Sequence, residues 1–159
     1  LPTVTASADE LESDLAPFRA LAQHPAVLVA MTGHLVFTAW DKALPATQSV
    51  AVIEGIIRGA IGFDGLLLTD DLDMEALSGS VPERAQLSVE AGCDIALNCW
   101  AKMDDMIGIA KLLPAMREDS AARLKRVHER IAQLRIARRK LDQSQLVAKR
   151  DALLGLVSA

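Results

Sequence analysis

Apolar residues along the chain fall into short uninterrupted runs, and stretches of helical periodicity separate them. The runs are AVLVAM at 26–31, LLLT at 66–69 and DIALN at 94–98. None of them alternates between apolar and polar positions, so they are typical of parallel strands that are buried on both faces. The runs begin roughly 30 to 40 residues apart, which is the scale of a strand–helix–strand unit. The pattern therefore predicts an α/β fold with a parallel sheet.

The first two helical stretches begin at recognisable caps. Ser7 and Glu10 have the spacing of a capping box in front of a helix that is predicted over 8–21. Ser49 is the expected cap of a second helix. The apolar face of that second helix consists of Val50, Ile53, Ile57 and Ile61.

Other segments carry breakers or later helices. Residues 32–47 are expected to form a long loop, because Gly33 and Pro45 interrupt any regular element. A helix is predicted over 82–91, since a proline fits its first turn and Gly92 stops it. Further helices are predicted over 103–113, 119–140 and 144–157, and the apolar face of the helix over 119–140 consists of Leu124, Val127, Ile131 and Leu134.

Composition narrows the class of protein. The chain has 159 residues, of which 51% are apolar, enough for the core of one domain. A net charge of −4 argues against a general nucleic-acid binder, which is usually basic. No apolar run approaches the about 18 residues of a membrane span, and the first residues lack the pattern of a signal peptide. With two cysteines and no disulfide framework, we expect a cytoplasmic protein whose partners include neither nucleic acid nor membrane.

The candidate chemistry lies in GFDGLLLTDDLDMEAL, residues 62–77. Its leucines end abruptly in Asp70 and Asp71, and Asp73 follows. Parallel α/β folds place their chemistry at the carboxyl ends of strands, and Asp70 is the best candidate because it follows the strand directly. On position alone, a turn or helix cap built from these carboxylates explains them equally well.

Three polar residues adjoin the other two strands. His34 follows the first strand and Asn98 ends the third, both at the same edge as Asp70. Either side chain is a candidate for a ligand contact, although a structural role satisfied by backbone hydrogen bonds also fits His34. Asp94 lies at the opposite end of its strand, where acids are usually structural.

The pattern does not favour a metal centre. Asp70, Asp71 and Asp73 offer oxygen ligands but lack the spacing of a calcium loop. Cys93 and Cys99 have no second pair of ligands, so a zinc site is not predicted. We expect no metal and no cofactor.

Residues 62–77 resemble the signature around the catalytic aspartate of glycoside hydrolase family 3, in its bacterial β-N-acetylhexosaminidase branch. VAMTGHLVF, SVEAGCDIALNC and SAARLKRVHERIAQLR are similar to further segments of that family. The resemblance implies a (β/α)₈ barrel, with the three strands here as the sixth, seventh and eighth. It also implies hydrolysis of terminal β-linked N-acetylglucosamine by a retaining mechanism, in peptidoglycan recycling.

The resemblance carries over to individual positions. Asp70 falls on the catalytic nucleophile of the family, and Asp71 on its less exposed neighbour. Thr69 stands where the family usually has Ser, a change that keeps the hydroxyl group. Met74 also matches the pattern, and His34 and Met74 are predicted to bind substrate.

One family motif is not in these 159 residues. The family's general acid/base is a histidine within a Lys-His-Phe-Pro-Gly-His-Gly loop, and in the family a Leu-Pro pair follows that loop. We therefore expect an incomplete barrel, the C-terminal part of one domain, with βα units over 1–114 and closing helices over 115–159. We expect this segment alone to be inactive, and to bind its missing N-terminal half or to self-associate.

Two alternatives remain open from the sequence. A phosphoacceptor receiver domain also ends a central strand with an aspartate, but the first strand here ends in Met31-Thr32-Gly33, without the acidic pair that such domains need. A non-catalytic α/β module is the other alternative, in which Asp70 has no chemical role.

Overall fold

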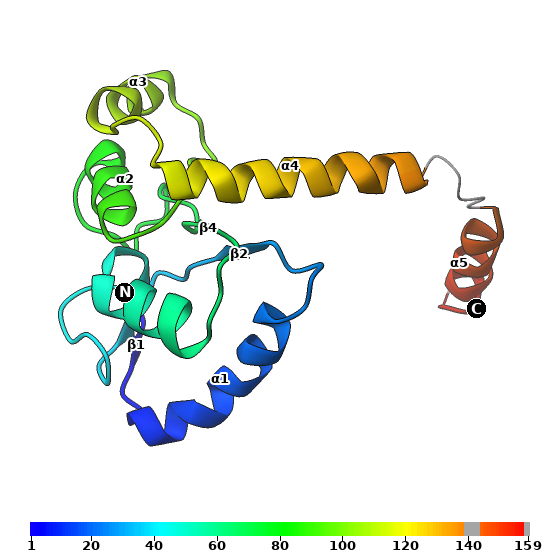
Figure 1. The fold of residues 1–159 in the computed structure, drawn as a ribbon, viewed down its shortest axis with the longest axis horizontal. Helices are drawn as coiled ribbons and strands as arrows, with labels where there is room; N and C mark the ends of the chain where they lie inside the picture. The colour runs from blue at the N-terminus through cyan, green and yellow to red at the C-terminus, as the bar shows by residue number, and fades with distance from the viewer. Residues whose placement is uncertain (139–143, 158–159) are drawn as a thin grey trace. The chain divides into compact units, whose positions relative to one another are not determined.

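The computed structural model describes residues 1–138 and 144–157. The chain divides into two compact units, Leu1–Val127 and His128–Ala159. The larger unit contains all the strands among the described residues, and Figure 1 shows the succession of its elements.

The central sheet pairs β2 (Val29–Met31) with β4 (Leu66–Leu68) in parallel, with Val29 opposite Leu66. The predicted third strand over 94–98 is reduced to a single parallel bridge between Leu68 and Ile95. The regular ladder stops there because the Thr69 hydroxyl, rather than a backbone carbonyl, accepts the N–H of Leu97 at 2.8 Å. The parallel arrangement predicted from the apolar runs is thus confirmed, and the predicted length of the third strand is wrong.

A second parallel pair joins β1 (Thr3–Val4) to β3 (Val36–Phe37). The latter strand and a turn of 3₁₀ helix, η1 (Ala46–Gln48), lie in the stretch 32–47 that was expected to be loop. Two apolar residues are too short a run to predict a strand from sequence. The pairing becomes possible because the segment around Pro2 runs alongside and accepts the N–H of Val36 at 3.0 Å.

Three helices of the larger unit follow the predictions closely. Helix α1 (Ala8–Ala22) begins with the predicted capping box, in which Ser7 and Glu10 bond each other's backbone N–H groups. Helix α2 (Val81–Glu90) has a capping box of its own, and Gly92 follows it with φ +121°, a backbone conformation that favours glycine. Helix α3 (Met103–Leu112) is the predicted helix over 103–113.

The element η2 (Ala51–Ala60) differs from prediction because it is a π-helix. Its hydrogen bonds reach one residue further back than those of an α-helix, as the bond from the Ile61 N–H to the Ile56 carbonyl shows. Ile53 is fully buried, whereas Val50, predicted on the same face, precedes the π-helix and is 57% exposed.

Helix α4 (Glu118–Arg138) begins in the larger unit, and the predicted end near Lys140 lies outside the described residues. Leu124 and Val127 are half-buried, whereas Ile131 and Leu134 are exposed. Helix α5 (Ser144–Val157) has the predicted bounds and lies in the smaller unit. None of the helices described for residues 1–138 and 144–157 combines the length and the apolarity needed to cross a membrane.

The buried core of the larger unit consists of two clusters. One lies between η2, β4 and the end of α2, and contains Ile53, Phe63, Leu67, Ala91 and Cys93. The other contains Leu72, Leu77 and Ala85, and therefore packs the segment just after β4 against α2. The second cluster therefore fixes the backbone of the segment that contains Asp70, Asp71 and Asp73.

Candidate active site

The acidic loop, residues 69–74, follows β4 directly and is held from below. Within the loop, the side chain of Leu72 is fully buried and packs against α2. From α2, the Arg84 guanidinium donates hydrogen bonds to the carbonyls of Leu72 at 2.8 Å and Met74 at 3.0 Å. A buried leucine and a bridging arginine thus fix the backbone that carries the carboxylates.

Asp70 occupies the first position after the buried Thr69. Its Oδ1 accepts a hydrogen bond from the backbone N–H of Asp71 at 2.8 Å, which orients the carboxylate. The residue is half-buried, so the carboxylate is oriented and still accessible to a ligand. A nucleophile needs both properties.

Asp71 and Asp73 have a different role, since both bind the backbone of the segment that follows Ile95. Asp71 Oδ1 accepts the N–H of Cys99 at 3.0 Å, and Asp73 Oδ2 accepts the N–H of Trp100 at 3.0 Å. Partial burial raises the pKa of Asp71, but the hydrogen bonds from the Cys99 and Asp73 N–H groups outweigh it and hold that pKa below its usual value. These two carboxylates therefore join the acidic loop to the neighbouring strand end.

His34 lies against the same loop and is only 5% exposed. Its Nε2 lies 3.0 Å from the carbonyl of Asp71, and its Nδ1 lies 2.8 Å from the Thr47 hydroxyl, which in turn lies 2.9 Å from the Thr32 hydroxyl. Because a carbonyl only accepts, the Asp71 contact assigns a ring proton to Nε2. The Thr47 hydroxyl beside Nδ1 donates to the Gly33 carbonyl at 3.1 Å. Both ring nitrogens thus have partners within the protein.

The other predicted residues are spread around this edge. Met74 is 44% exposed, and its N–H donates to the Asp71 carbonyl at 3.2 Å. Asn98 Oδ1 accepts the N–H of Ala101 at 2.7 Å, while its buried Nδ2 has no partner within hydrogen-bond distance. Asp70, His34 and Asn98 thus lie at the edge of the sheet where the strand ends were expected to bring them, and Met74 lies in the loop that follows Asp70.

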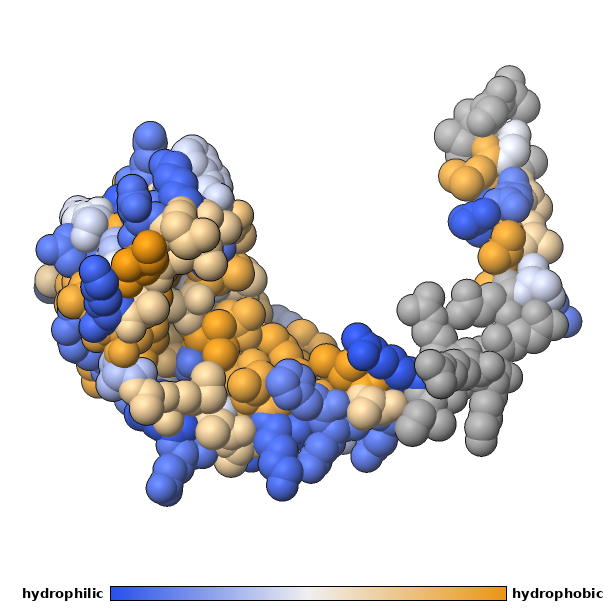
Figure 2. Space-filling model, turned by 90° about the horizontal axis from the view of Figure 1, so that it is seen from above, coloured by the Kyte–Doolittle hydropathy of each residue, from blue (hydrophilic) through white to orange (hydrophobic). Residues whose placement is uncertain are grey.

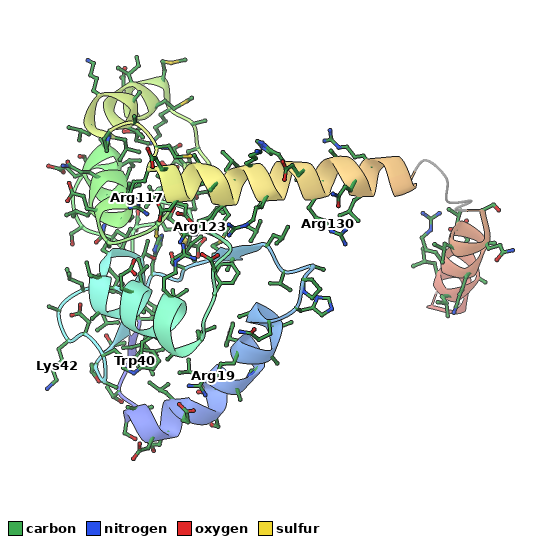
Figure 3. The ribbon with its side chains drawn as sticks, in the orientation of Figure 1. Arg19, Trp40, Lys42, Arg117, Arg123 and Arg130 are labelled. Atoms are coloured by element: carbon green, nitrogen blue, oxygen red, sulfur yellow. The ribbon has the colours of Figure 1, made fainter. Side chains whose placement is uncertain are left out.

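Asp94 has the structural role predicted for it. Its buried carboxylate accepts hydrogen bonds from Arg58 at 2.9 Å, Arg123 at 3.1 Å and the Leu67 N–H at 2.8 Å. Arg117, just before α4, and Arg123, in its first turns, both form ion pairs with this carboxylate, and Figure 3 shows the two arginines near the beginning of the helix. The interaction ties η2, β4 and the first turns of α4 together.

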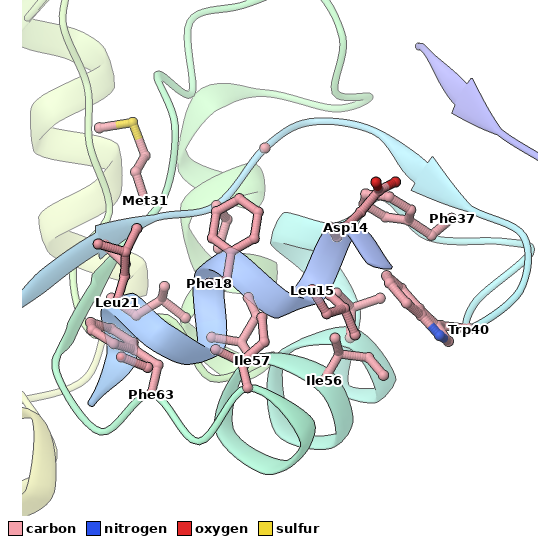
Figure 4. A pocket seen from close by; sticks show the side chains of 18 of the residues that line it. Asp14, Leu15, Phe18, Leu21, Met31, Phe37, Trp40, Ile56, Ile57 and Phe63 are labelled. Carbon is pink, nitrogen blue, oxygen red and sulfur yellow. The ribbon is translucent and has the colours of Figure 1, made fainter. Parts of the chain in front are cut away.

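A cavity with a volume of about 570 Å³ lies elsewhere, between α1, β2 and η2. Figure 4 shows Phe18, Leu21 and Met31 beside Ile57 around it. The lining is almost entirely apolar, and Asp70 is not part of it. This cavity offers packing surface rather than chemistry.

The cysteines are poor candidates for catalysis or metal binding. Burial raises the pKa of Cys93 to about 12, so its thiol stays protonated. Burial and the charges of Asp71, Asp73 and Asp70 also raise the pKa of the Cys99 thiol. Across the part of the chain that the structure describes, no three His, Cys, Asp or Glu side chains gather closely enough to hold a metal ion.

With this geometry in place, the sequence profile described as "Glycosyl hydrolase family 3 N terminal domain" matches residues 1–145. The chain belongs to glycosyl hydrolase family 3. Members of this family have a TIM-barrel-like α/β fold in this domain, in agreement with the parallel strands seen here. Because the chain belongs to this family, the alternative of a phosphoacceptor receiver domain is excluded.

Relatives within family 3 bear names that match the resemblance. A β-hexosaminidase of Tolumonas auensis is 35% identical over 125 residues, which are 77% of this chain and 36% of the relative. A β-hexosaminidase of Neisseria gonorrhoeae is 44% identical over 102 residues, which are 62% of this chain and 28% of the relative. The chain thus spans about a third of the length of these relatives.

Solved structures of family 3 enzymes are similar as well. A β-N-acetylglucosaminidase from Paenibacillus sp. matches 83% of this chain and 27% of its own, with a TM-score of 0.73 and 37% identity. NagZ from Neisseria gonorrhoeae, solved in complex with N-trifluoroacetyl-D-glucosamine, matches 79% of this chain and 36% of its own, with a TM-score of 0.68 and 37% identity.

Sequence reasoning missed two residues that organise the site. The Thr47 hydroxyl is hydrogen-bonded to Nδ1 of His34, and the Arg84 guanidinium donates to the Leu72 carbonyl of the acidic loop. Thr47 lies in a stretch expected to be loop, and no sequence pattern indicates that its hydroxyl would reach His34. For Arg84, its place in the first turns of a helix directly after the acidic loop was a usable signal.

Proposed function

We propose that this chain supplies the nucleophile of a β-N-acetylglucosaminidase of family 3, and that Asp70 is that nucleophile. The observation that carries the proposal is an accessible carboxylate, oriented by the Asp71 N–H, directly after a parallel strand of a family 3 domain. The names of the relatives support the sugar, terminal β-linked N-acetylglucosamine.

In the proposed retaining mechanism, Asp70 attacks the anomeric carbon while the bond to the leaving oxygen breaks. A general acid protonates that oxygen, so the leaving group departs as an alcohol rather than an alkoxide. Water, deprotonated by the same group, then attacks the anomeric carbon and releases Asp70. The backbone bond to Asp70 Oδ1 helps to keep the carboxylate aligned for attack.

The proton donor is proposed to come from outside these 159 residues. His34 is poorly suited to donate a proton to substrate, because it is buried and both ring nitrogens have protein partners. Its predicted role in substrate binding is therefore proposed to be indirect, through the Asp71 carbonyl. Met74, which is 44% exposed, remains the proposed direct contact.

The barrel is proposed to be completed by further strands. Residues 1–114 would contribute its last βα units and residues 115–159 the closing helices. The apolar cavity beside β2 supports this arrangement, because it offers packing surface for another element. We further propose a cytoplasmic role in peptidoglycan recycling, by analogy with the branch that the sequence resembles.

The decisive experiment tests Asp70 in the full-length protein. Asp70→Ala should remove nearly all release of nitrophenol from the p-nitrophenyl N-acetyl-β-glucosaminide, while Glu75→Gln, a control at an exposed acid directly after the acidic loop, should retain activity. A 2-fluoro sugar that traps the covalent intermediate should label Asp70 in peptide mass spectrometry. Labelling of Asp71 or Asp73 would reassign the nucleophile.

A second experiment tests where the acid resides. The chain of 159 residues alone should not hydrolyse the same substrate, because general acid catalysis contributes about 10² to 10⁴-fold and most of the sugar-binding surface is absent. Adding the separately produced N-terminal part should restore activity. Robust turnover by the 159 residues alone, abolished by Asp70→Ala, would place the acid within them.

A further inference from the structure

Trp100 lies at the same strand-end edge as Asp70 and is not used by the proposed function. It is 67% exposed, an unusual position for an indole that could be buried. Its backbone N–H donates to Asp73 Oδ2 at 3.0 Å, and the preceding N–H, that of Cys99, donates to Asp71 Oδ1 at 3.0 Å. The backbone that carries the exposed ring is therefore bound to the acidic loop.

The backbone beside Trp100 is strained to hold this arrangement. Ala101 has φ +50°, in the left-handed region that costs a residue with a Cβ free energy. Asn98 Oδ1 stabilises the turn by accepting the Ala101 N–H at 2.7 Å. Strain of this kind persists where surrounding contacts over-determine the backbone, and it is concentrated at ligand sites.

Lys102 completes the surface around the ring. Its Nζ lies 4.8 Å from the centroid of the Trp100 ring, within the range of a cation–π contact. The ring remains largely exposed despite this contact, so a ligand can stack on it. The ammonium group next to it can donate hydrogen bonds to hydroxyl or carboxylate oxygens.

We propose that Trp100 and Lys102 form the binding site for the leaving-group sugar of the substrate. A pyranose ring has one face of C–H groups that stacks on an indole, and hydroxyl groups at its rim that accept hydrogen bonds from an ammonium. The Trp100 N–H is bonded to Asp73, three residues after Asp70, so the proposed surface adjoins the loop that carries the proposed nucleophile. The inference rests on the proposed function, because it assigns the second sugar of that substrate.

The test compares two substrates in the full-length protein. N,N′-diacetylchitobiose carries a sugar as its leaving group, whereas N-acetyl-β-glucosaminyl fluoride carries only a fluoride that cannot reach Trp100. Trp100→Ala should lower kcat/KM for the disaccharide about tenfold, the loss of one aromatic stacking contact, and leave kcat/KM for the fluoride unchanged. Trp100→Phe should keep most of the disaccharide activity. Met103→Ala removes a neighbouring side chain of matched exposure, 66%, and should affect neither substrate.

Other outcomes separate the two proposals. Equal losses on both substrates, or no loss on the disaccharide, would overturn the leaving-group site and leave the nucleophile standing. If the wild type cleaves neither substrate, the proposed function fails. Calorimetric titration with N,N′-diacetylchitobiose then tests Trp100 without turnover. If the Trp100→Ala variant binds the disaccharide as tightly as the wild type does, the proposed site at Trp100 is excluded.

Discussion

Thr69, Asp70 and Asp71 are consecutive residues whose side chains perform three different tasks. The Thr69 hydroxyl accepts the Leu97 N–H, the Asp70 carboxylate is oriented but accessible, and the Asp71 carboxylate binds the Cys99 N–H. The Ser that the family usually has at position 69 also carries a hydroxyl, so Thr69 can keep this contact. One short sequence thus provides both the proposed nucleophile and the contacts that immobilise it.

The Asp71 contact should make stability depend on pH. The pKa of Asp71 is lower in the folded chain than in the unfolded one, so its ionised form stabilises the fold above the ordinary aspartate pKa of about 3.9. That contribution is lost as the pH falls through the lowered pKa. Asp71→Asn keeps an oxygen acceptor but lacks the charge, so it should be less stable than the wild type at pH 7, and the difference should shrink as the pH falls below about 3.9.

The measurement is urea unfolding of both proteins at one fixed protein concentration across this range, because association would shift the apparent free energy. Asp9→Asn is the matched control, since Asp9 is exposed and should show little difference at any pH. A stability difference that persists unchanged at pH 3 would mean that the carboxylate charge is not responsible.

The position of these residues was predictable, whereas their contacts were not. Leucines that stop at paired aspartates specify a strand end, and parallel strands bring their carboxyl ends to one edge, so Asp70 and His34 could be placed together. The Thr47 partner of His34 depends on how residues 32–47 turn. That turn depends on the pairing of β1 with β3, which involves only two residues in each strand.

At the scale of elements, Asp94 is the point where η2, β4 and α4 meet. Arg58, which bonds it from η2, also donates to the carbonyls of Phe63 at 2.9 Å and Gly65 at 2.7 Å. The turn into β4 and the start of α4 therefore share one buried carboxylate. The helices themselves were predictable from their caps and periodicity, but the wider turn of η2 was not, because no residue pattern distinguishes it from an α-helix.

Removing the Asp94 carboxylate should destabilise the fold strongly. Asp94→Ala leaves Arg58 and Arg123 without their buried partner, and breaking a buried ion pair from one side costs about 3 kcal/mol or more. Asp94→Asn keeps an oxygen for the Leu67 N–H and should lose less, which keeps the comparison measurable if the alanine variant fails to fold. Thermal and urea unfolding provide the free energies.

The matched control removes an exposed pair. Arg150 and Asp151 form a bridge in α5 with both side chains more than half exposed, and Asp151→Ala should leave the unfolding transition nearly unchanged because exposed pairs contribute little. Equal effects of the Asp94 and Asp151 substitutions would contradict the structural role of Asp94.

At the scale of the molecule, the larger unit exposes much apolar surface. Figure 2 shows apolar atoms, orange and tan, on the surface of this unit. Among the described residues, β2 pairs with β4 on one side only, and its Val29 and Met31 are 44% and 53% exposed. Phe18 and Leu21 on α1 are similarly exposed beside the apolar cavity. Surface of this kind is usually covered by a partner.

We expect the chain of 159 residues to self-associate in isolation. Burying apolar surface is worth about 25 cal/mol per Å². Contact between the exposed apolar side chains of α1 and β2 and those of a second copy should therefore offset the entropy of association. Light scattering should give a mass above that of one chain. The double substitution Phe18→Ser and Met31→Ser should lower this mass, whereas Met103→Ser, at an equally exposed position on α3, should not. A monodisperse monomer with a cooperative melt would contradict the expectation.

The parallel pairing of β2 with β4 has a consequence for the order of events during folding. The two strands are separated in sequence by the loop of 32–47 and the whole of η2, and the bridge to Ile95 requires α2 to fold back in turn. Each pairing closes a long loop before it gains any contact, whereas the capped helices need only local residues. Helical structure should therefore accumulate first, and the strand ends that carry Asp70 and Trp100 should be among the last parts of the chain to come together.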